Sequence, residues 1–130
     1  MVIMALGKIK ADTLEHSTSG SVDTQYVVSG SAKQWVNLDG TGTAAIQDSL
    51  NCTSFTDGGT GDYQPNFANA MGNANYSVNC TGGDSGDRYH GDLVSKGSAT
   101  TSLYRTYWVN TSASANDCDI VCTSVHGDLA

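Results

Sequence analysis

The sequence contains few positively charged residues. Only 6 Lys+Arg stand against 13 Asp+Glu, so the net charge is −7. Nucleic-acid binding depends mainly on neutralising phosphates with Lys and Arg, and this composition therefore argues against DNA and RNA as partners. The acidic residues are spread along the chain rather than clustered, which is typical of a solvated surface.

Long apolar runs are missing as well. No stretch approaches the roughly 20 apolar residues of a membrane-spanning helix, so we expect no membrane insertion. The short apolar start Met1–Leu6 is followed by Lys8 and Lys10 rather than a cleavage site, so we expect no secretory signal. Either Met1 or Met4 can serve as the natural start.

Core-forming residues are also limited. Hydrophobic residues make up 38% of the 130 residues, while 15 Gly and many Ser, Thr, Asn and Asp supply turns. A chain of this length and composition predicts one modest hydrophobic core. We expect that core in a domain spanning residues 31–130, preceded by an extended N-terminal arm at residues 1–30 that lacks a sustained apolar period.

From Ala32 onward, apolar residues alternate with polar ones at the period of β-strands. Glycine-rich turns separate the runs, notably Asp57–Asp62 and Thr81–Asp87, and Pro65 predicts a strand that is open on one side there. The pattern predicts an all-β fold, a β-sandwich or jelly roll of seven to eight short antiparallel strands. The expected strands include 44–50, 52–56, 89–94, 102–109 and 117–126.

The strand Ser102–Val109 carries large side chains on both faces. Tyr104, Thr106 and Trp108 alternate with Leu103, Arg105, Tyr107 and Val109. A strand of a lone small sandwich is expected to be polar on one face, so this pattern indicates a second buried surface such as a subunit interface. Four aromatic residues are candidates for interface contacts or for stacking on sugars, with core packing as the commoner role of such residues: Trp35, Tyr104, Tyr107 and Trp108.

No motif predicts catalysis. Gly83–Gly86 matches the sequence around the nucleophilic serine of chymotrypsin-like proteases. Those enzymes need a histidine base upstream, and the only upstream histidine, His16, lies within the predicted arm. Asp57 and Asp62 have the residue type of the two carboxylates that glycoside hydrolysis requires. However, they flank a glycine turn, where Asp is common for structural reasons. We therefore expect a protein that is not an enzyme.

No motif predicts a metal ion or another cofactor. Four residues near the second glycine-rich turn could in principle supply calcium ligands, but their spacing fits no calcium loop. They are Asp84, Asp87, His90 and Asp92.

The four cysteines leave their pairing open. Cys118 and Cys122 lie on one predicted strand, where they would be roughly 13 Å apart, and a disulfide needs Cα atoms within about 7 Å. They should not bridge each other. The alternatives are Cys52–Cys118 with Cys80–Cys122, the crossed pairing, or four free thiols. Free thiols are favoured for a protein assembled in a reducing cytoplasm.

Several strings of the β-domain resemble a domain of tailed, marine-type bacteriophages. The strings are Ala32–Thr43, Ile46–Asn51, Thr56–Tyr63, Asn66–Phe67, Ala70–Tyr76 and Val125–Asp128. Such domains occur in tail fibres and other virion surface proteins, and the resemblance extends from Ala32 to the C-terminus. The sequence departs from the pattern at Cys52, Cys80, Cys122, Pro65 and His126.

The resemblance implies a non-enzymatic virion protein that is made and assembled in the bacterial cytoplasm and exposed on the virion surface. Together with the two-faced strand Ser102–Val109, it predicts a homotrimer. Because residues 1–30 lack the alternation of core strands, we expect this arm to contact other capsid or tail proteins. We expect a capsid decoration (cement) protein or a short fibre. The alternative is the receptor-binding tip of a tail fibre that recognises a host surface glycan.

Overall fold

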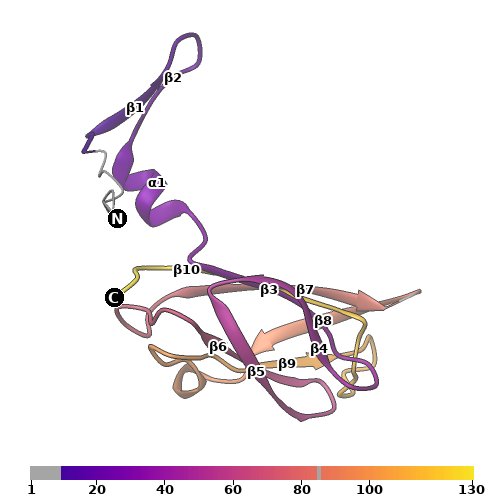
Figure 1. The fold of residues 1–130 in the computed structure, drawn as a ribbon. Coiled ribbons are helices and arrows are strands. Elements are labelled where there is room, and N and C mark those ends of the chain that lie inside the picture. The colour runs from indigo at the N-terminus through magenta and orange to yellow at the C-terminus, as the bar shows by residue number, and fades with distance from the viewer. Residues whose placement is uncertain (1–9, 85) are drawn as a thin grey trace, which may run out of the picture. The chain divides into compact units, whose positions relative to one another are not determined.

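The computed structural model describes residues 10–84 and 86–130 and divides the chain into two compact units. The N-terminal unit ends at Ser31, and the β-domain spans Ala32–Ala130. The predicted boundary, between Gly30 and Ser31, lies one residue away. Strands dominate the described chain, and one α-helix occurs in it, so the prediction of a mostly β protein is confirmed (Figure 1).

The described part of the N-terminal unit is a small hairpin followed by a short helix. Strands β1 (Thr13–His16) and β2 (Gly20–Asp23) pair antiparallel, and helix α1 covers Thr24–Gly30. Gly20 adopts φ +90°, which suits glycine and closes the turn between the strands. The expectation of an extended arm was therefore wrong for these residues, because three polar turn residues separate two short strands that pair with each other.

The β-domain contains eight strands in one hydrogen-bonded sheet, in the order β4-β3-β10-β7-β8-β9-β6-β5. Every neighbouring pair is antiparallel. The strands are β3 (Gln34–Asp39), β4 (Ala45–Leu50), β5 (Cys52–Gly59), β6 (Asp62–Phe67), β7 (Ser77–Asp84), β8 (Asp87–Leu93), β9 (Thr106–Val109) and β10 (Ile120–His126). A short 3₁₀ helix, η1 (Lys96–Ser98), follows β8.

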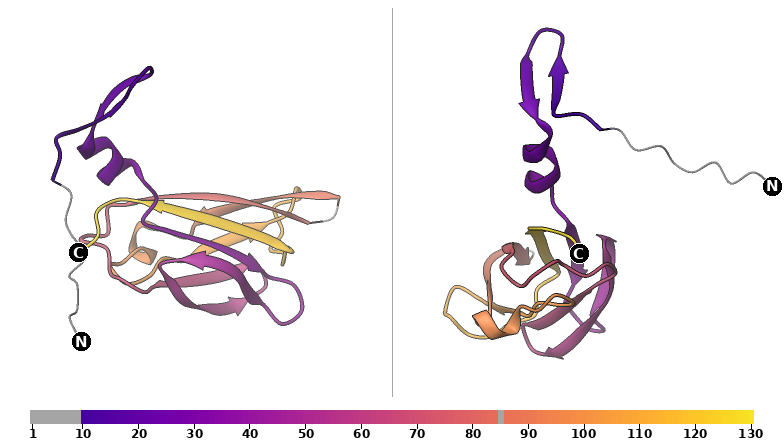
Figure 2. Two further views of the ribbon diagram at one scale, coloured as in Figure 1. Left: turned by 45° about the horizontal axis from the view of Figure 1, so that its top comes forward. Right: turned by 90° about the vertical axis from the view of Figure 1, so that its left-hand side faces the viewer.

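The sheet curls until it is nearly barrel-shaped (Figure 2). Strand β8 marks the bend, because its residues up to Tyr89 pair with β7 and those from His90 onward pair with β9. The two end strands, β4 and β5, follow each other directly in sequence across Asn51. The curvature places one face of every strand around a common interior.

Two adjoining clusters of side chains fill that interior. One contains Trp108, Tyr63, Leu38, Val36, Val121 and Cys118. The other contains Tyr104, Phe67, Tyr76, Met71 and Val125, and its aromatic rings pack with centroids 5.5–6.4 Å apart. These edge-on and tilted contacts are favourable arrangements for aromatic pairs.

Some predicted element bounds were wrong. The strand expected over Ser102–Val109 begins only at Thr106, and the strand expected from Asp117 begins at Ile120. Thr81–Asp87 is not one long loop, because β7 continues to Asp84. The expectation of an edge or an open side at Pro65 was wrong: the ladder between β6 and β9 stops after Tyr63, but the Tyr104 amide then donates a hydrogen bond to the Pro65 carbonyl at 3.3 Å while Phe55 pairs with Pro65 on the other side.

Candidate functional site

Two of the four predicted contact aromatics lie in the core. Tyr104 and Trp108 are completely buried, so as candidates for ligand or interface contacts they were wrong. Trp108 lies on the inward face of β9 with Thr106, and Tyr104 precedes the strand. The Trp108 indole donates a hydrogen bond to Thr106 Oγ1 at 3.1 Å, so this tryptophan also satisfies its polar group inside the fold.

Buried tyrosine hydroxyls join the strands from within. The Tyr104 hydroxyl donates to Gln34 Oε1 at 2.9 Å and also contacts Thr123 Oγ1. The Tyr63 hydroxyl donates to Asp117 Oδ1 at 2.8 Å. Burial raises the pKa of both phenols well above the ordinary value, so they stay protonated and act as structural donors rather than as acid–base groups.

Tyr107 lies on the outward face of β9, where its side chain is 41% exposed. Its neighbour Arg105 forms a two-pronged ion pair with Asp62, with Nε donating to Oδ1 at 2.7 Å and Nη2 donating to Oδ2. The structure therefore brings Tyr107 beside a fixed charge pair on the solvent side of the β-domain. The exposed Val94 follows the adjoining strand β8.

Trp35 lies on the opposite face of β3 from the buried Val36 and is partly exposed. The cross-strand register places Leu50, Trp35, Ser124 and Asn79 in one row across β4, β3, β10 and β7. The next row contains Asp48, Asn37, Cys122 and Thr81. A shallow groove crosses these rows between Trp35 on β3 and the side chains of β7. We call this the Trp35 groove.

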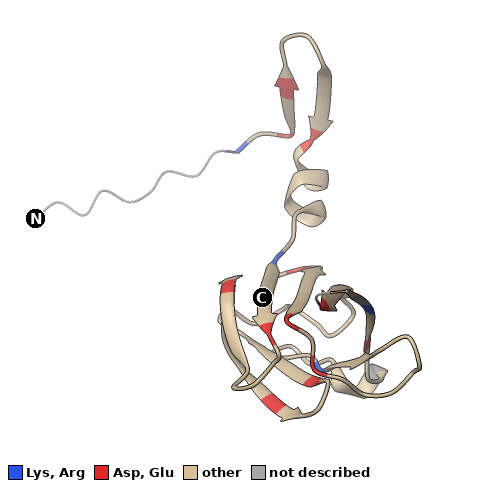
Figure 3. Ribbon diagram, turned by 90° about the vertical axis from the view of Figure 1, so that its right-hand side faces the viewer, with Lys and Arg blue, Asp and Glu red and all other residues tan. Residues whose placement is uncertain are grey.

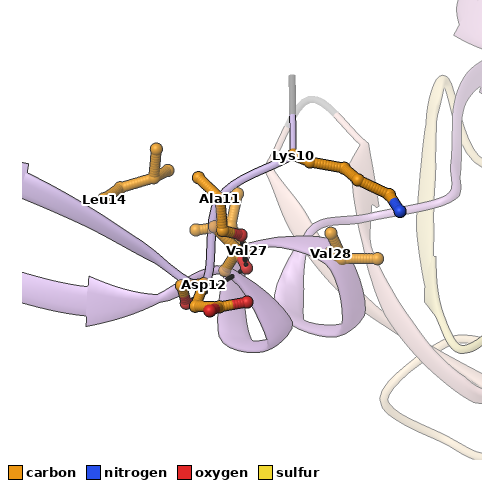
Figure 4. Close-up of a pocket in the computed structure, with 7 residues that line it drawn as sticks. Lys10, Ala11, Asp12, Leu14, Val27 and Val28 are labelled. Atoms are coloured by element: carbon orange, nitrogen blue, oxygen red, sulfur yellow. Dashed lines mark hydrogen bonds between the residues drawn. The ribbon is translucent and has the colours of Figure 1, made fainter. Parts of the chain in front are cut away.

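The N-terminal unit carries a second hollow, between the start of the hairpin and α1. Leu14, Val27 and Val28 line it together with Ala11, while Lys10 lies at its rim (Figure 4). Leu14 pairs across the hairpin with Val22, whereas Glu15 pairs with Ser21 on the other face. The hairpin is therefore amphipathic, and no side chain from Lys10 to Ser31 is buried.

Sequence reasoning named Trp35 as a candidate contact residue and residues 1–30 as the attachment segment, but it identified neither the groove around Trp35 nor the apolar face of the hairpin. The alternation of Leu14 and Glu15 was a usable signal, but it spans only one short strand. For the Trp35 groove, the signal was the presence of short polar residues at outward positions of the neighbouring strands, such as Asn79 on β7 and Ser124 on β10.

The candidate carboxylates do not form a reactive pair. Asp57 accepts a hydrogen bond from the Gly59 amide at 2.9 Å, and Asp62 is held by Arg105. Among the residues that the structure describes, no group of three or more His, Cys, Asp or Glu side chains is arranged to hold a metal ion, so Asp84, His90 and Asp92 form no such group. The side chain of Asp87 lies outside the described part of the chain. Ser85 of the protease-like string lies outside the described residues.

All four cysteines are free thiols in the structure. Burial, helped by the charge of Asp92, raises the pKa of Cys80 to about 11, and burial together with nearby carboxylates raises that of Cys118 to about 12. Burial also raises the pKa of Cys52 and Cys122. Because the thiolate is the reactive form, these cysteines behave as small packing groups at neutral pH.

Acidic side chains are distributed over several strands of the β-domain (Figure 3). None of the helices in the described parts of the chain has the length and apolarity to cross a membrane. Comparison with known proteins found no matching family model, no matching curated protein and no matching solved structure.

Proposed function

We propose that this protein is a non-enzymatic structural component of a bacteriophage virion, either a capsid decoration (cement) protein or a short fibre. The proposal starts from the resemblance of the chain from Ala32 to the C-terminus to virion surface domains. The observation that carries it is the apolar surface of the N-terminal unit. A small hairpin and a seven-residue helix expose Leu14, Val22, Tyr26, Val27 and Val28, between 41% and 66% of each side chain.

Such an element needs a neighbouring surface. Isolated two-stranded hairpins and helices shorter than about 12 residues are marginal in water because they bury too little apolar area. An amphipathic hairpin can add its main chain to a sheet edge and its apolar side chains to a groove of a partner. The N-terminal unit therefore attaches the protein to another capsid or tail protein, and the β-domain is displayed on the virion surface after assembly in the host cytoplasm.

Self-association is the second part of the proposal. The outward face of β9 combines the half-exposed Tyr107 with the fixed Arg105–Asp62 pair and the nearby Val94. Aromatic and Arg side chains are enriched where protein interfaces bury most surface. We assign this face to the contacts of a homotrimer.

The finer fold assignment supports the same role. The partner change within β8 divides the curved sheet into two groups of strands. We therefore assign the β-domain to the β-sandwich or jelly-roll type, with the N-terminal unit acting as the attachment arm.

A receptor-binding tip that recognises a host glycan is the second candidate function. The Trp35 groove favours it, because an exposed aromatic surrounded by short polar side chains suits a sugar.

The test is to express a tagged copy of this chain in a host infected with the phage that encodes it. Purified particles are then examined by mass spectrometry and cryo-electron microscopy. We expect trimeric density in many copies on the shell or at a fibre. Density at the far end of a tail would favour the receptor-binding candidate, and particles without the chain would overturn both.

A further inference from the structure

We propose that the Trp35 groove is a binding site for a neutral saccharide. The inference rests on the second candidate function, which it deepens by naming the class of sugar, and it does not depend on attachment or trimer formation. Its walls come from three adjacent strands: Trp35 and Asn37 from β3, Cys122 and Ser124 from β10, and Asn79 and Thr81 from β7.

Trp35 supplies the apolar part of the site. The chain has two tryptophans, and Trp108 is completely buried whereas Trp35 keeps a partly exposed indole on the outside of the sheet. A tryptophan face is large and rigid, and it costs little conformational entropy when a flat, weakly polar ligand face packs on it. The C–H face of a pyranose ring has this character.

The polar part of the site consists of side chains that make no hydrogen bonds within the described part of the protein. Among the described residues, Asn37, Asn79, Thr81, Ser124 and the Trp35 indole have no side-chain hydrogen bond to another residue. By contrast, the side chains of Asn51, Asn66 and Asn116 are hydrogen-bonded to other parts of the β-domain. The groove therefore presents amide and hydroxyl groups that can both donate and accept, as ligand hydroxyls require.

Charge selects a neutral ligand. The groove is lined without any ionisable carboxylate or basic group, and Asp48 lies in the row beside Asn37 and Cys122. An anionic sugar or a phosphate would face this carboxylate without a matching cation, and the chain as a whole has a net charge of −7. A neutral hexose or N-acetylhexosamine unit has no such penalty.

The experiment follows the two indole N–H signals by NMR while neutral sugars are added to the full-length chain. The probes are glucose, galactose, mannose and N-acetylglucosamine and short oligomers of each, with glucuronic acid as the charged contrast. We expect at least one neutral sugar to shift the Trp35 signal with saturation in the millimolar range, while the Trp108 signal stays in place.

Two substitutions and a control locate the site. Trp35→Ala should weaken binding about tenfold or more, and Asn79→Ala about fivefold, which corresponds to loss of one hydrogen bond. Ile120→Ala changes an exposed residue on the same face of β10 outside the groove and should leave binding unchanged. For Trp35→Ala, sugar binding is followed through the backbone amide signals of β7 and β10.

Three results would overturn the proposal. The first is that no neutral sugar shifts the Trp35 signal, and the second is that glucuronic acid binds more tightly than every neutral sugar. The third is that the Trp35 signal changes on dilution alone, which would make the groove a contact between copies of this chain. Each of these results leaves the virion test of the proposed function unaffected.

Discussion

The indole ring of Trp108 occupies the space in which Gly91 would carry a side chain. A Cβ atom built on Gly91 would lie 2.4 Å from Cε2 of Trp108, and one built on Gly82 would lie 2.2 Å from Cζ3. Strands β7 and β8 thus each leave a gap, and the largest buried side chain of the protein fills both.

Gly91→Ala should therefore destabilise the β-domain by about 1–3 kcal/mol, because the indole cannot move without disturbing a close-packed core. Gly97→Ala is the control, since a Cβ there meets nothing closer than 3.9 Å. Urea unfolding of both variants measures the difference. Equal free energies of unfolding for the two would show that the core yields easily around Trp108.

This packing also explains one limit of prediction from the sequence. Glycines predict turns because they tolerate many backbone angles, and for that reason the sequence predicts a loop over Thr81–Asp87. Here Gly82 and Gly91 are strand residues, and glycine is required at both positions because a side chain would overlap the Trp108 ring. That requirement comes from Trp108, which is remote in sequence, so local pattern could not reveal it.

Alternation succeeded where one face of a strand is buried. Val36 and Leu38 on β3 and Val121, Thr123 and Val125 on β10 are all buried. The same rule put Gln34 inside and Trp35 outside, because strand register moves all residues of a face together. Residue type alone would instead bury the tryptophan and expose the glutamine. For the same reason, residue type did not separate the two buried aromatic candidates from the two at the surface.

Tyr63→Phe should cost about 1–3 kcal/mol of unfolding free energy. The substitution removes the hydroxyl that donates to Asp117, and the ring remains to fill the space beside Gly40. Tyr107→Phe is the matched control, because among the described residues the Tyr107 hydroxyl has no hydrogen-bond partner. Urea unfolding compares the two, and a Tyr107→Phe loss as large as that of Tyr63→Phe would contradict the argument.

The protein should lose stability as the pH rises above 9. Burial raises the pKa of Cys80 from 9.0 to about 11 and that of Tyr76 from 10.0 to about 12, and it raises the pKa of Tyr63 and Tyr104 further. In the unfolded chain these groups release their protons at the ordinary values. The folded state then binds more protons, so the free energy of unfolding falls with increasing pH.

Urea unfolding at a series of alkaline pH values measures this decline. Tyr76→Phe should show a shallower one, because it removes one of the groups that ionise only after unfolding. A free energy of unfolding that stays constant from pH 9 to about 11 would contradict the prediction.

The four thiols should react with iodoacetamide slowly and unequally. Cys118 is completely buried and should be alkylated only after unfolding, whereas Cys122, on the outward face of β10, should be the first to react. Mass mapping after short exposure at neutral pH checks the order. Rapid alkylation of Cys118 in the folded protein, or a disulfide between Cys118 and Cys122, would contradict this arrangement.

Attachment to the particle should depend on one face of the β1–β2 hairpin. Val22 belongs to the apolar face with Leu14, while the adjacent Ser21 belongs to the polar face with Glu15. Val22→Asp puts a charge where we propose that a partner covers the hairpin, and burying an unpaired carboxylate is strongly unfavourable. Ser21→Asp adds the same charge on the opposite face and serves as the matched control.

Both variants should keep the far-ultraviolet circular dichroism and the urea midpoint of the unmodified protein, because every buried core residue lies at or after Gln34. Their mass by light scattering should remain that of three chains, since the trimer contacts are assigned to β9. The amount retained on purified particles should fall about tenfold or more for Val22→Asp and stay near normal for Ser21→Asp. Normal retention of Val22→Asp would place attachment in the β-domain instead, and a loss of the trimer in that variant alone would make the hairpin the self-association surface.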